Sequence, residues 1–327
     1  MTRPTWQRFA SLSLVMAALA SGTTAEDDAH VRVSVSTSFP ATQVELVSIH
    51  PHNSTAFTEG LFFMDDTLVE STGLQSRSFI RQYRIMDPTD LATRIHAASE
   101  GENDEDSGSG DDEDESTDEE PRKGVVLKEF QFSSDIFGEG IACIGDKIYA
   151  LTYKQNKVLV LAKDSFKLLE THPFHTSTGE GWGMTTDGKL LIVSDGSSSI
   201  QYFDPQQKFK RVKSFDVTLP SGEKVDNLNE LEFVEGEILA NVWFKNDILR
   251  IDPTDGHVIE VLDLSWLPAM VPNLRTMSHM KTDAVMNGIA YNHKNRHVYV
   301  TGKLWDSMFE LELSYLKRHA QIRKVGA

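Results

Sequence analysis

Short runs of hydrophobic residues recur five times along the chain, and each run opens on an acidic or amide residue, usually beside glycine. The five openings are Glu59-Gly60-Leu61-Phe62, Glu139-Gly140-Ile141-Ala142, Glu180-Gly181-Trp182-Gly183, Asn229-Glu230-Leu231-Glu232 and Asn287-Gly288-Ile289-Ala290. Turn residues such as Asp65-Asp66 or Asp187-Gly188 follow, and then come a second and a third β-rich run. Most openings are separated by roughly 41 to 58 residues, a spacing typical of the blades of a β-propeller.

A fourth strand is visible in four of the five units, for example over 124–132 and 258–264. The last unit lacks one, and the alternating segment from Val44 to Ile49, which precedes the first repeat, can supply it. Such a strand would join the two ends of the chain in one blade and remove the open edge of the ring. We therefore predict an all-β, five-bladed β-propeller over residues 44–313, closed by an N-terminal strand that joins the last blade.

The interval between the first two openings is 80 residues because it contains an acidic insert. Thirteen Asp or Glu residues and no Lys or Arg lie between Ser99 and Glu120, and they account for most of the net charge of −17. Because this composition cannot bury enough apolar surface to fold, residues 97–122 are predicted to form a disordered loop within blade one. The acidic balance argues against nucleic acid as a partner.

The two ends of the chain predict segments outside the propeller. The basic residues Arg3 and Arg8 are followed by an apolar run of about 12 residues from Phe9 to Ala20, too short to span a bilayer. Residues 1–25 are therefore predicted to be a secretory signal peptide, residues 26–43 a linker and residues 314–327 a C-terminal tail. We expect an extracellular monomer without stable membrane insertion, with Asn53 as an acceptor for an N-glycan.

The hairpin geometry of propeller blades predicts that polar and aromatic residues meet at one rim. The first strand of each blade lines the central channel, and in an antiparallel hairpin its start lies at the same edge as the end of the second strand. These starts and ends carry Glu59, Glu139, Glu180, Trp182, Asn229, Asn287, Glu70, Tyr153, Asp195, Trp243 and Lys303. Taken singly, each residue has a structural explanation, such as a turn or blade packing. Their common edge instead predicts a binding or catalytic site.

Ten short motifs in these positions resemble those of the plant-type glutaminyl cyclases. They are Phe57-Thr58-Glu59-Gly60-Leu61, Glu70-Ser71-Thr72-Gly73-Leu74, Phe137-Gly138-Glu139-Gly140, Leu151-Thr152-Tyr153-Lys154, Gly179-Glu180-Gly181-Trp182-Gly183, Ser194-Asp195-Gly196-Ser197, Leu228-Asn229-Glu230-Leu231-Glu232, Ala240-Asn241-Val242-Trp243, Asn287-Gly288-Ile289-Ala290-Tyr291 and Thr301-Gly302-Lys303-Leu304-Trp305. The resemblance runs in order from about residue 44 to 312 and omits only the acidic insert.

The resemblance implies a glutaminyl-peptide cyclotransferase, which closes the N-terminal Gln of peptides and proteins to pyroglutamate and releases ammonia. It implies that Glu139 is the acid/base group and that Trp182 and Trp243 line the substrate pocket. Asn229 and Lys303 complete the site, as donors that can stabilise the oxyanion of the tetrahedral intermediate.

Three further positions belong to the expected substrate pocket. Phe57 matches an aromatic residue of the family's first motif. Glu59 stands where the family usually has Gln, and Tyr153 stands where it usually has Trp. Tyr153 keeps an aromatic face, so activity is expected to survive. Glu59 adds negative charge near the substrate's α-ammonium, which is expected to change the pH optimum or the affinity.

Metal catalysis is not expected, because no HExxH motif is present and no cofactor is required for the reaction. A structural calcium ion in the channel, bound by Asp195 and backbone carbonyls, stays open. Two other functions also stay open. One is a calcium-dependent propeller lactonase or esterase, which EDTA would inactivate. The other is a non-catalytic propeller that binds peptides without releasing ammonia.

Overall fold

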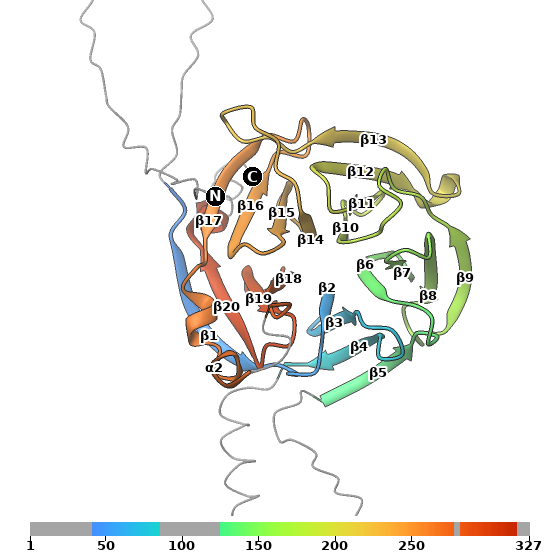
Figure 1. The fold of residues 1–327 in the computed structure, drawn as a ribbon, viewed down its shortest axis with the longest axis horizontal. Helices are drawn as coiled ribbons and strands as arrows, with labels where there is room; N and C mark the ends of the chain where they lie inside the picture. Colours follow the sequence, from blue (N-terminus) through green and yellow to red (C-terminus); the bar gives the residue numbers. More distant parts are fainter. Residues whose placement is uncertain (1–40, 86–124, 278–281, 319–327) are drawn as a thin grey trace, which may run out of the picture. The chain divides into compact units, whose positions relative to one another are not determined.

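The computed structural model describes residues 41–85, 125–277 and 282–318, and it arranges their strands as five four-stranded antiparallel sheets around an axis (Figure 1). The first three blades comprise β2 (Thr58–Met64), β3 (Thr67–Thr72), β4 (Phe79–Arg84) and β5 (Val125–Gln131); β6 (Gly138–Ile144), β7 (Lys147–Thr152), β8 (Lys157–Ala162) and β9 (Leu168–Pro173); and β10 (Met184–Thr186), β11 (Leu191–Ser194), β12 (Ser199–Asp204) and β13 (Lys210–Asp216). The last two comprise β14 (Leu228–Val234), β15 (Glu237–Val242), β16 (Asp247–Ile251) and β17 (Val258–Asp263); and β18 (Met286–Asn292), β19 (His297–Gly302), β20 (Ser307–Leu313) and β1 (Val44–Pro51). The predicted five-bladed propeller is confirmed.

The N-terminal strand closes the ring as predicted. β1 pairs antiparallel with β20, with Val44 opposite Leu313 and Pro51 opposite Ser307. In Figure 1 the blue β1 lies along the outside of the last blade, beside β20. Side chains add to this pairing, since His50 Nε2 lies 2.8 Å from Glu310 Oε2. The last blade is therefore built from both ends of the sequence.

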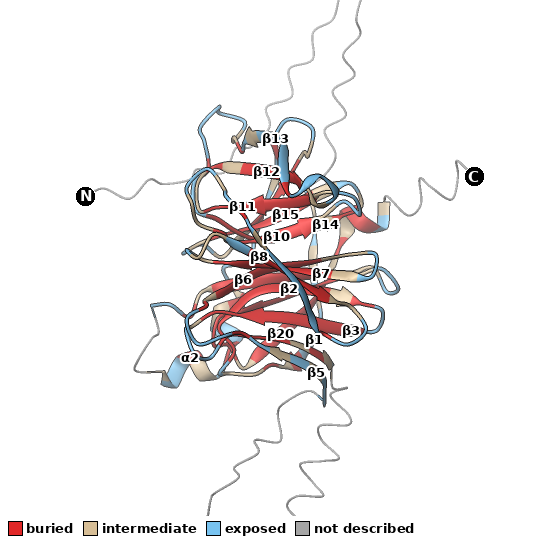
Figure 2. Ribbon diagram, turned by 90° about the vertical axis from the view of Figure 1, so that its right-hand side faces the viewer, coloured by how far each residue is buried: buried red, intermediate tan, exposed pale blue. Residues whose placement is uncertain are grey.

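The core lies between neighbouring blades rather than inside one sheet. Middle strands such as β7 and β8 have nearly continuous apolar runs because both of their faces are covered by adjacent blades. Between blades one and two, Phe62 and Ile80 form one buried cluster with Ile141, Ile148 and Leu159. Figure 2 shows the buried strands stacked through the centre and exposed residues on the outer strands and loops.

The inner strands of neighbouring blades do not form ladders with one another, so side chains satisfy part of their backbone. Glu230 on β14 accepts hydrogen bonds from the amides of Leu61 at 3.2 Å and Ile289 at 2.8 Å. Glu232, two residues further, accepts from the amide of Tyr291 at 3.0 Å. Two carboxyl groups of blade four therefore connect it to blades one and five.

The stretch between β17 and β18, where a lid or a short helix was expected, contains a 3-10 turn at Leu267–Met270 and the short helix α2 at Asn273–Thr276. Asn273 anchors α2 to the last blade, because its Nδ2 donates to the carbonyl of Leu304 at 2.7 Å. Its backbone amide donates to Asp306 Oδ2 at 3.1 Å. The short helix is thus fixed against the loop that follows β19.

The predicted signal peptide over 1–25 and the predicted insert over 97–122 lie outside the described residues. The same holds for most of the linker over 26–43 and for the last nine residues of the tail over 314–327. The last residue of β4, Arg84, lies opposite Val125, the first residue of β5, at the edge of blade one that is remote from the starts of the inner strands. None of the helices in the described ranges is long and apolar enough to cross a membrane.

Candidate active site

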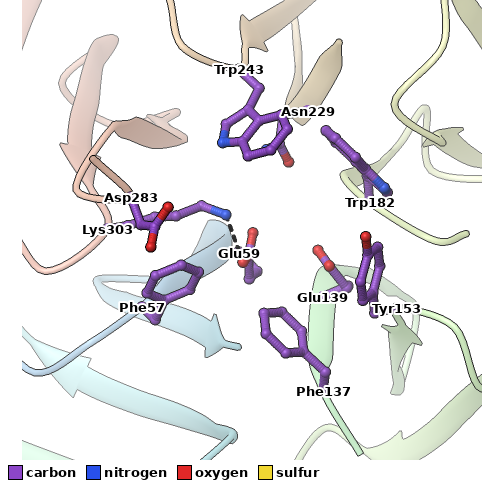
Figure 3. Close-up of a pocket in the computed structure, with 10 residues that line it drawn as sticks. All are labelled: Phe57, Glu59, Phe137, Glu139, Tyr153, Trp182, Asn229, Trp243, Asp283 and Lys303. Atoms are coloured by element: carbon purple, nitrogen blue, oxygen red, sulfur yellow. Dashed lines mark hydrogen bonds and ion pairs between the residues drawn. The ribbon is translucent and has the colours of Figure 1, made fainter. Parts of the chain in front are cut away.

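A cavity of about 170 Å³ opens at the rim where the inner strands begin (Figure 3). Its lining consists of Phe57, Glu59, Phe137, Glu139, Tyr153, Trp182, Asn229, Trp243, Asp283 and Lys303. All eight residues selected from the sequence are among these ten, and their side chains point toward a common centre in Figure 3. The structure thus brings together, from all five blades, seven of the eleven residues that the hairpin geometry predicted at one edge; Glu70, Glu180, Asp195 and Asn287 do not line the cavity.

Two glycines let the inner strands approach closely enough to form this rim. A Cβ atom on Gly140, next to Glu139, would lie 2.3 Å from the backbone nitrogen of Met184. A Cβ atom on Gly183, next to Trp182, would lie 2.0 Å from the carbonyl oxygen of Asn229. Any side chain at either position would separate the blades. The glycines of the repeat therefore set the distance between the site residues.

Three ionisable side chains meet at the floor of the cavity. Lys303 Nζ donates to Glu59 Oε1 at 2.6 Å, and both side chains are almost fully buried. Asn287 Nδ2 lies 3.3 Å from Glu59 Oε2 and thereby contacts the second oxygen of this carboxyl. Glu139 lines the cavity beside Glu59 (Figure 3).

Burial, and next the neighbouring Glu59, raise the pKa of Glu139 well above its ordinary value. Burial also raises the pKa of Glu59, although Lys303 opposes this effect. The floor therefore carries a lysine, an acid that is paired with it and a second acid that favours its neutral form.

Aromatic rings form the walls of the cavity. Trp182 and Trp243 stand perpendicular to each other, with centroids 5.4 Å apart and planes at 86°. On the other side Phe137 packs edge-on against Phe57, with ring centroids 6.2 Å apart. The centroids of Phe137 and Tyr153 are 5.6 Å apart. These rings offer apolar faces that can hold a short side chain in one conformation, as expected of a small-molecule pocket.

Asn229 contributes the one amide of the lining. Its side chain is 3% exposed, and its Oδ1 is buried without a hydrogen-bond partner among the described residues. A buried polar atom without a partner is uncommon in a folded protein and is found where a ligand completes the pairing. Asn229 is therefore placed to form hydrogen bonds with a molecule in the cavity.

Two lining residues, Phe137 and Asp283, were missed by the sequence reasoning. Phe137 precedes Glu139 by two residues, just as Phe57 precedes Glu59, so the repeated Phe-x-Glu-Gly pattern carried the signal. Asp283 comes from the connection between β17 and β18, which has no counterpart in the other blades, so no repeat could identify it. Figure 3 places it beside Lys303 at the edge of the cavity.

A second layer of side chains supports the aromatic walls. Glu180 Oε2 accepts a hydrogen bond from Trp182 Nε1 at 3.0 Å, and its other oxygen pairs with Lys154 Nζ at 3.1 Å. Lys154 also lies over the ring of Tyr153, 4.6 Å from its centroid. Glu180 thus orients one wall rather than lining the cavity itself.

Two acids of the predicted rim lie away from the cavity. Glu70 is buried in a pair with His52, at 2.9 Å. Asp195 accepts hydrogen bonds from Gln201 Nε2 at 2.8 Å and from the Ser197 hydroxyl at 2.5 Å. Both Asp195 oxygens thus accept hydrogen bonds from protein donors, and the structural calcium ion considered from the sequence stays a prediction.

The fold and the site define a propeller enzyme whose small, aromatic-walled pocket brings carboxyl groups, a lysine and an amide to one substrate. A family model described as glutamine cyclotransferase matches residues 13–313. The glutaminyl-peptide cyclotransferase of Arabidopsis thaliana is 32% identical over 272 residues, which cover 83% of this chain and 71% of that protein. The crystal structure of the glutaminyl cyclase of Myxococcus xanthus matches with a TM-score of 0.64 at 28% identity, covering 83% of this chain and 96% of that one.

The chain belongs to the glutamine cyclotransferase family. The resemblance carried by the ten sequence motifs is confirmed, and the lactonase or esterase and the non-catalytic binder are not favoured.

Proposed function

We propose that this protein is a glutaminyl-peptide cyclotransferase that acts on peptides and proteins with an N-terminal Gln. The observation that carries this proposal is the cavity itself, which combines three carboxyl groups and a lysine within aromatic walls, together with a buried amide whose oxygen has no partner among the described residues. The open end of the cavity would let the rest of the peptide extend into solvent. The reaction is intramolecular, so the site must fold one flexible side chain back on its own amine.

Orientation is the first contribution that we assign to the site. The perpendicular rings of Trp182 and Trp243 would hold the Gln side chain bent, with its amide carbon near the α-amine. Well-oriented intramolecular reactions gain up to roughly 7–11 kcal/mol from such positioning. Asn229 and Lys303 would bind the polar atoms of the substrate, and the N–H groups of Lys303 not used by Glu59 can stabilise a developing oxyanion.

Proton transfer is the second contribution. The amine must lose one proton when it attacks the amide carbon, and the leaving nitrogen must gain one to depart as ammonia. Glu139 is our acid/base group, because it lies on the floor of the cavity and its raised pKa favours the protonated form, which can donate to the leaving nitrogen.

A coupled ammonia assay tests the proposal directly. A short peptide with N-terminal Gln should release ammonia. The same peptide with N-terminal Asn should not, because its shorter side chain would have to close into a smaller, strained ring. The activity should persist in EDTA, since no step that we assign uses a metal. Absence of ammonia release, with tight binding of the Gln peptide, would instead support a non-catalytic role.

We also propose that the chain is exported and acts as a monomer. The apolar segment from Phe9 to Ala20 supports export, and Asn53 in its sequon would then be available for an N-glycan. Expression in a eukaryotic secretory host should give a processed protein in the medium. Its mass should fall on treatment with an N-glycosidase, and light scattering should give the mass of one chain.

A further inference from the structure

The cavity floor holds two buried carboxyl groups but only one cation. Glu59 and Glu139 are 1% and 5% exposed, and both line the cavity together with Lys303. Burying two carboxylates beside a single ammonium group would leave one negative charge without a partner, which is costly away from water. The pair therefore carries one proton.

The surroundings show which carboxyl is ionised. Glu59 forms an ion pair with the ammonium group of Lys303 at 2.6 Å and accepts a hydrogen bond from the side-chain amide of Asn287 at 3.3 Å. Glu139 has no ion-pair partner within the described ranges. Glu59 and Glu180, which precedes β10, both oppose a negative charge on Glu139, whereas Lys303 favours it but is already paired with Glu59. Glu230 on β14 lies near Glu59, and Asp283 adds a further acid at the cavity edge. The proton is therefore assigned to Glu139.

We propose that Glu59 and Glu139 act as a pair that divides the two proton transfers of the reaction, with Glu59 as the base and Glu139 as the acid. This inference rests on the proposed function, and it transfers to Glu59 the base half of the role given there to Glu139, so that Glu59 becomes a catalytic residue. A single carboxyl that first accepts and then donates would have to begin ionised. Glu139 begins protonated, so the first proton must go elsewhere, and the ionised Glu59 is the adjacent acceptor.

The proton balance closes over one turnover. The neutral α-amine attacks the amide carbon, a C–N bond forms, and Glu59 takes one of the two amine protons. Glu139 gives its proton to the amide nitrogen, the old C–N bond breaks, and ammonia leaves. One hydrogen remains on the lactam nitrogen. The pair then holds its proton on Glu59, and transfer of this proton to Glu139 restores the starting state.

The pH profile of Glu59→Gln tests this division of roles. In the parent protein the active pair has one proton, so kcat/KM should fall about tenfold per pH unit above the pH at which Glu139 ionises. In Glu59→Gln, Glu139 loses its acidic neighbour, becomes ionised at lower pH and performs both transfers, so this alkaline decline should disappear. The ratio of variant to parent, measured with one Gln peptide, should therefore rise with pH on the alkaline side. The ionisation of the substrate amine cancels in this ratio.

A spectroscopic count of protonated carboxyl groups gives a second readout that needs no turnover. Infrared difference spectra over a pH series should show one protonated-carboxyl band that is absent in Glu139→Gln and that disappears at a lower pH in Glu59→Gln than in the parent, because Glu139 has lost its acidic neighbour. Glu232→Gln is the matched control. It removes a buried protonated carboxyl that does not line the cavity, so it should lose a different band and keep its activity.

The outcomes separate the pair from the proposed function. A constant ratio of Glu59→Gln to parent at every pH, or an unchanged carboxyl band in Glu59→Gln, would show that Glu59 is only a counter-ion for Lys303 and would overturn the proposal. A parent protein that releases no ammonia would refute the proposed function, while the infrared count would still decide whether the pair shares a proton. Should Glu59→Gln fail to fold, Glu59→Asp keeps the charge, and its alkaline decline should match that of the parent.

Discussion

Replacing Glu232 by glutamine should stabilise the protein at alkaline pH and change little under mildly acidic conditions. Glu232 lies on β14 near the axis, where it accepts hydrogen bonds from the Tyr291 amide at 3.0 Å and the Thr185 hydroxyl at 3.2 Å. Burial raises the pKa of this carboxyl from 4.5 to about 8, although these hydrogen bonds oppose the shift. Glutamine has nearly the shape of the protonated acid and cannot ionise, so it mimics the neutral form at every pH.

The sign and size of the effect follow from proton linkage. The pKa of Glu232 is higher in the folded than in the unfolded state. The contribution of its protonated carboxyl to the free energy of unfolding is therefore full below about pH 4.5 and is lost as the pH rises through 8. Each pH unit in this window costs about 1.4 kcal/mol, so the parent should lose about 4 kcal/mol between pH 5 and pH 9 through this group alone. The free energy of unfolding of Glu232→Gln, relative to the parent, should rise by that amount over the same range.

Urea unfolding followed by tryptophan fluorescence and by circular dichroism measures this difference. The unfolding curves should be collected at pH 5, 7 and 9, and the free energies of unfolding should be compared where the m values, the slopes against urea concentration, are equal. Glu223→Gln, on an exposed turn, controls for the loss of one negative charge. If the difference between Glu232→Gln and the parent were the same at pH 5 and pH 9, Glu232 would not hold a proton in the folded protein, and the argument from its burial would be refuted.

Three further changes have definite expected outcomes. Lys303→Met should lower the free energy of unfolding by about 3 kcal/mol, because it leaves Glu59 buried without its cation. Adding Glu59→Gln should recover most of this loss, and equal stability of the single and double variants in urea would contradict this reasoning. Trp243→Ala should lower kcat/KM for a Gln peptide by about 10- to 100-fold with partial recovery in Trp243→Phe, since the perpendicular pair with Trp182 is lost; unchanged steady-state kinetics would count against the orienting role. Deletion of residues 88–122 should leave kcat/KM within about twofold and the melting temperature unchanged or higher, because Arg84 and Val125 already pair and a short hairpin loop can join them; a loss of activity would show that the insert contributes to the site.

The sequence predicted the architecture and most of the site because both follow from one repeat. Once the openings at Glu139, Trp182 and Asn229 are read as starts of inner strands, antiparallel geometry places them at one edge, and the structure confirms this. The ion pair between Glu59 and Lys303 could not be predicted, because it joins the first and last blades through a specific rotamer choice. Asp283 lies in a connection without a repeat, and its position depends on how that connection packs against blade five.

Closure of the ring by β1 has a consequence for the order of folding. The partner of the first strand is the last strand, so β1 has no native neighbour until nearly the whole sequence has been synthesised. Until then blade four is an open end of an incomplete stack, and the buried acids of β14 lack the backbone amides of β18 that they bind in the finished protein. Long-range pairing of this kind slows folding. A circular permutant that begins at β2 and carries β1 directly after β20 should therefore complete its last blade as a local unit and refold faster than the natural chain.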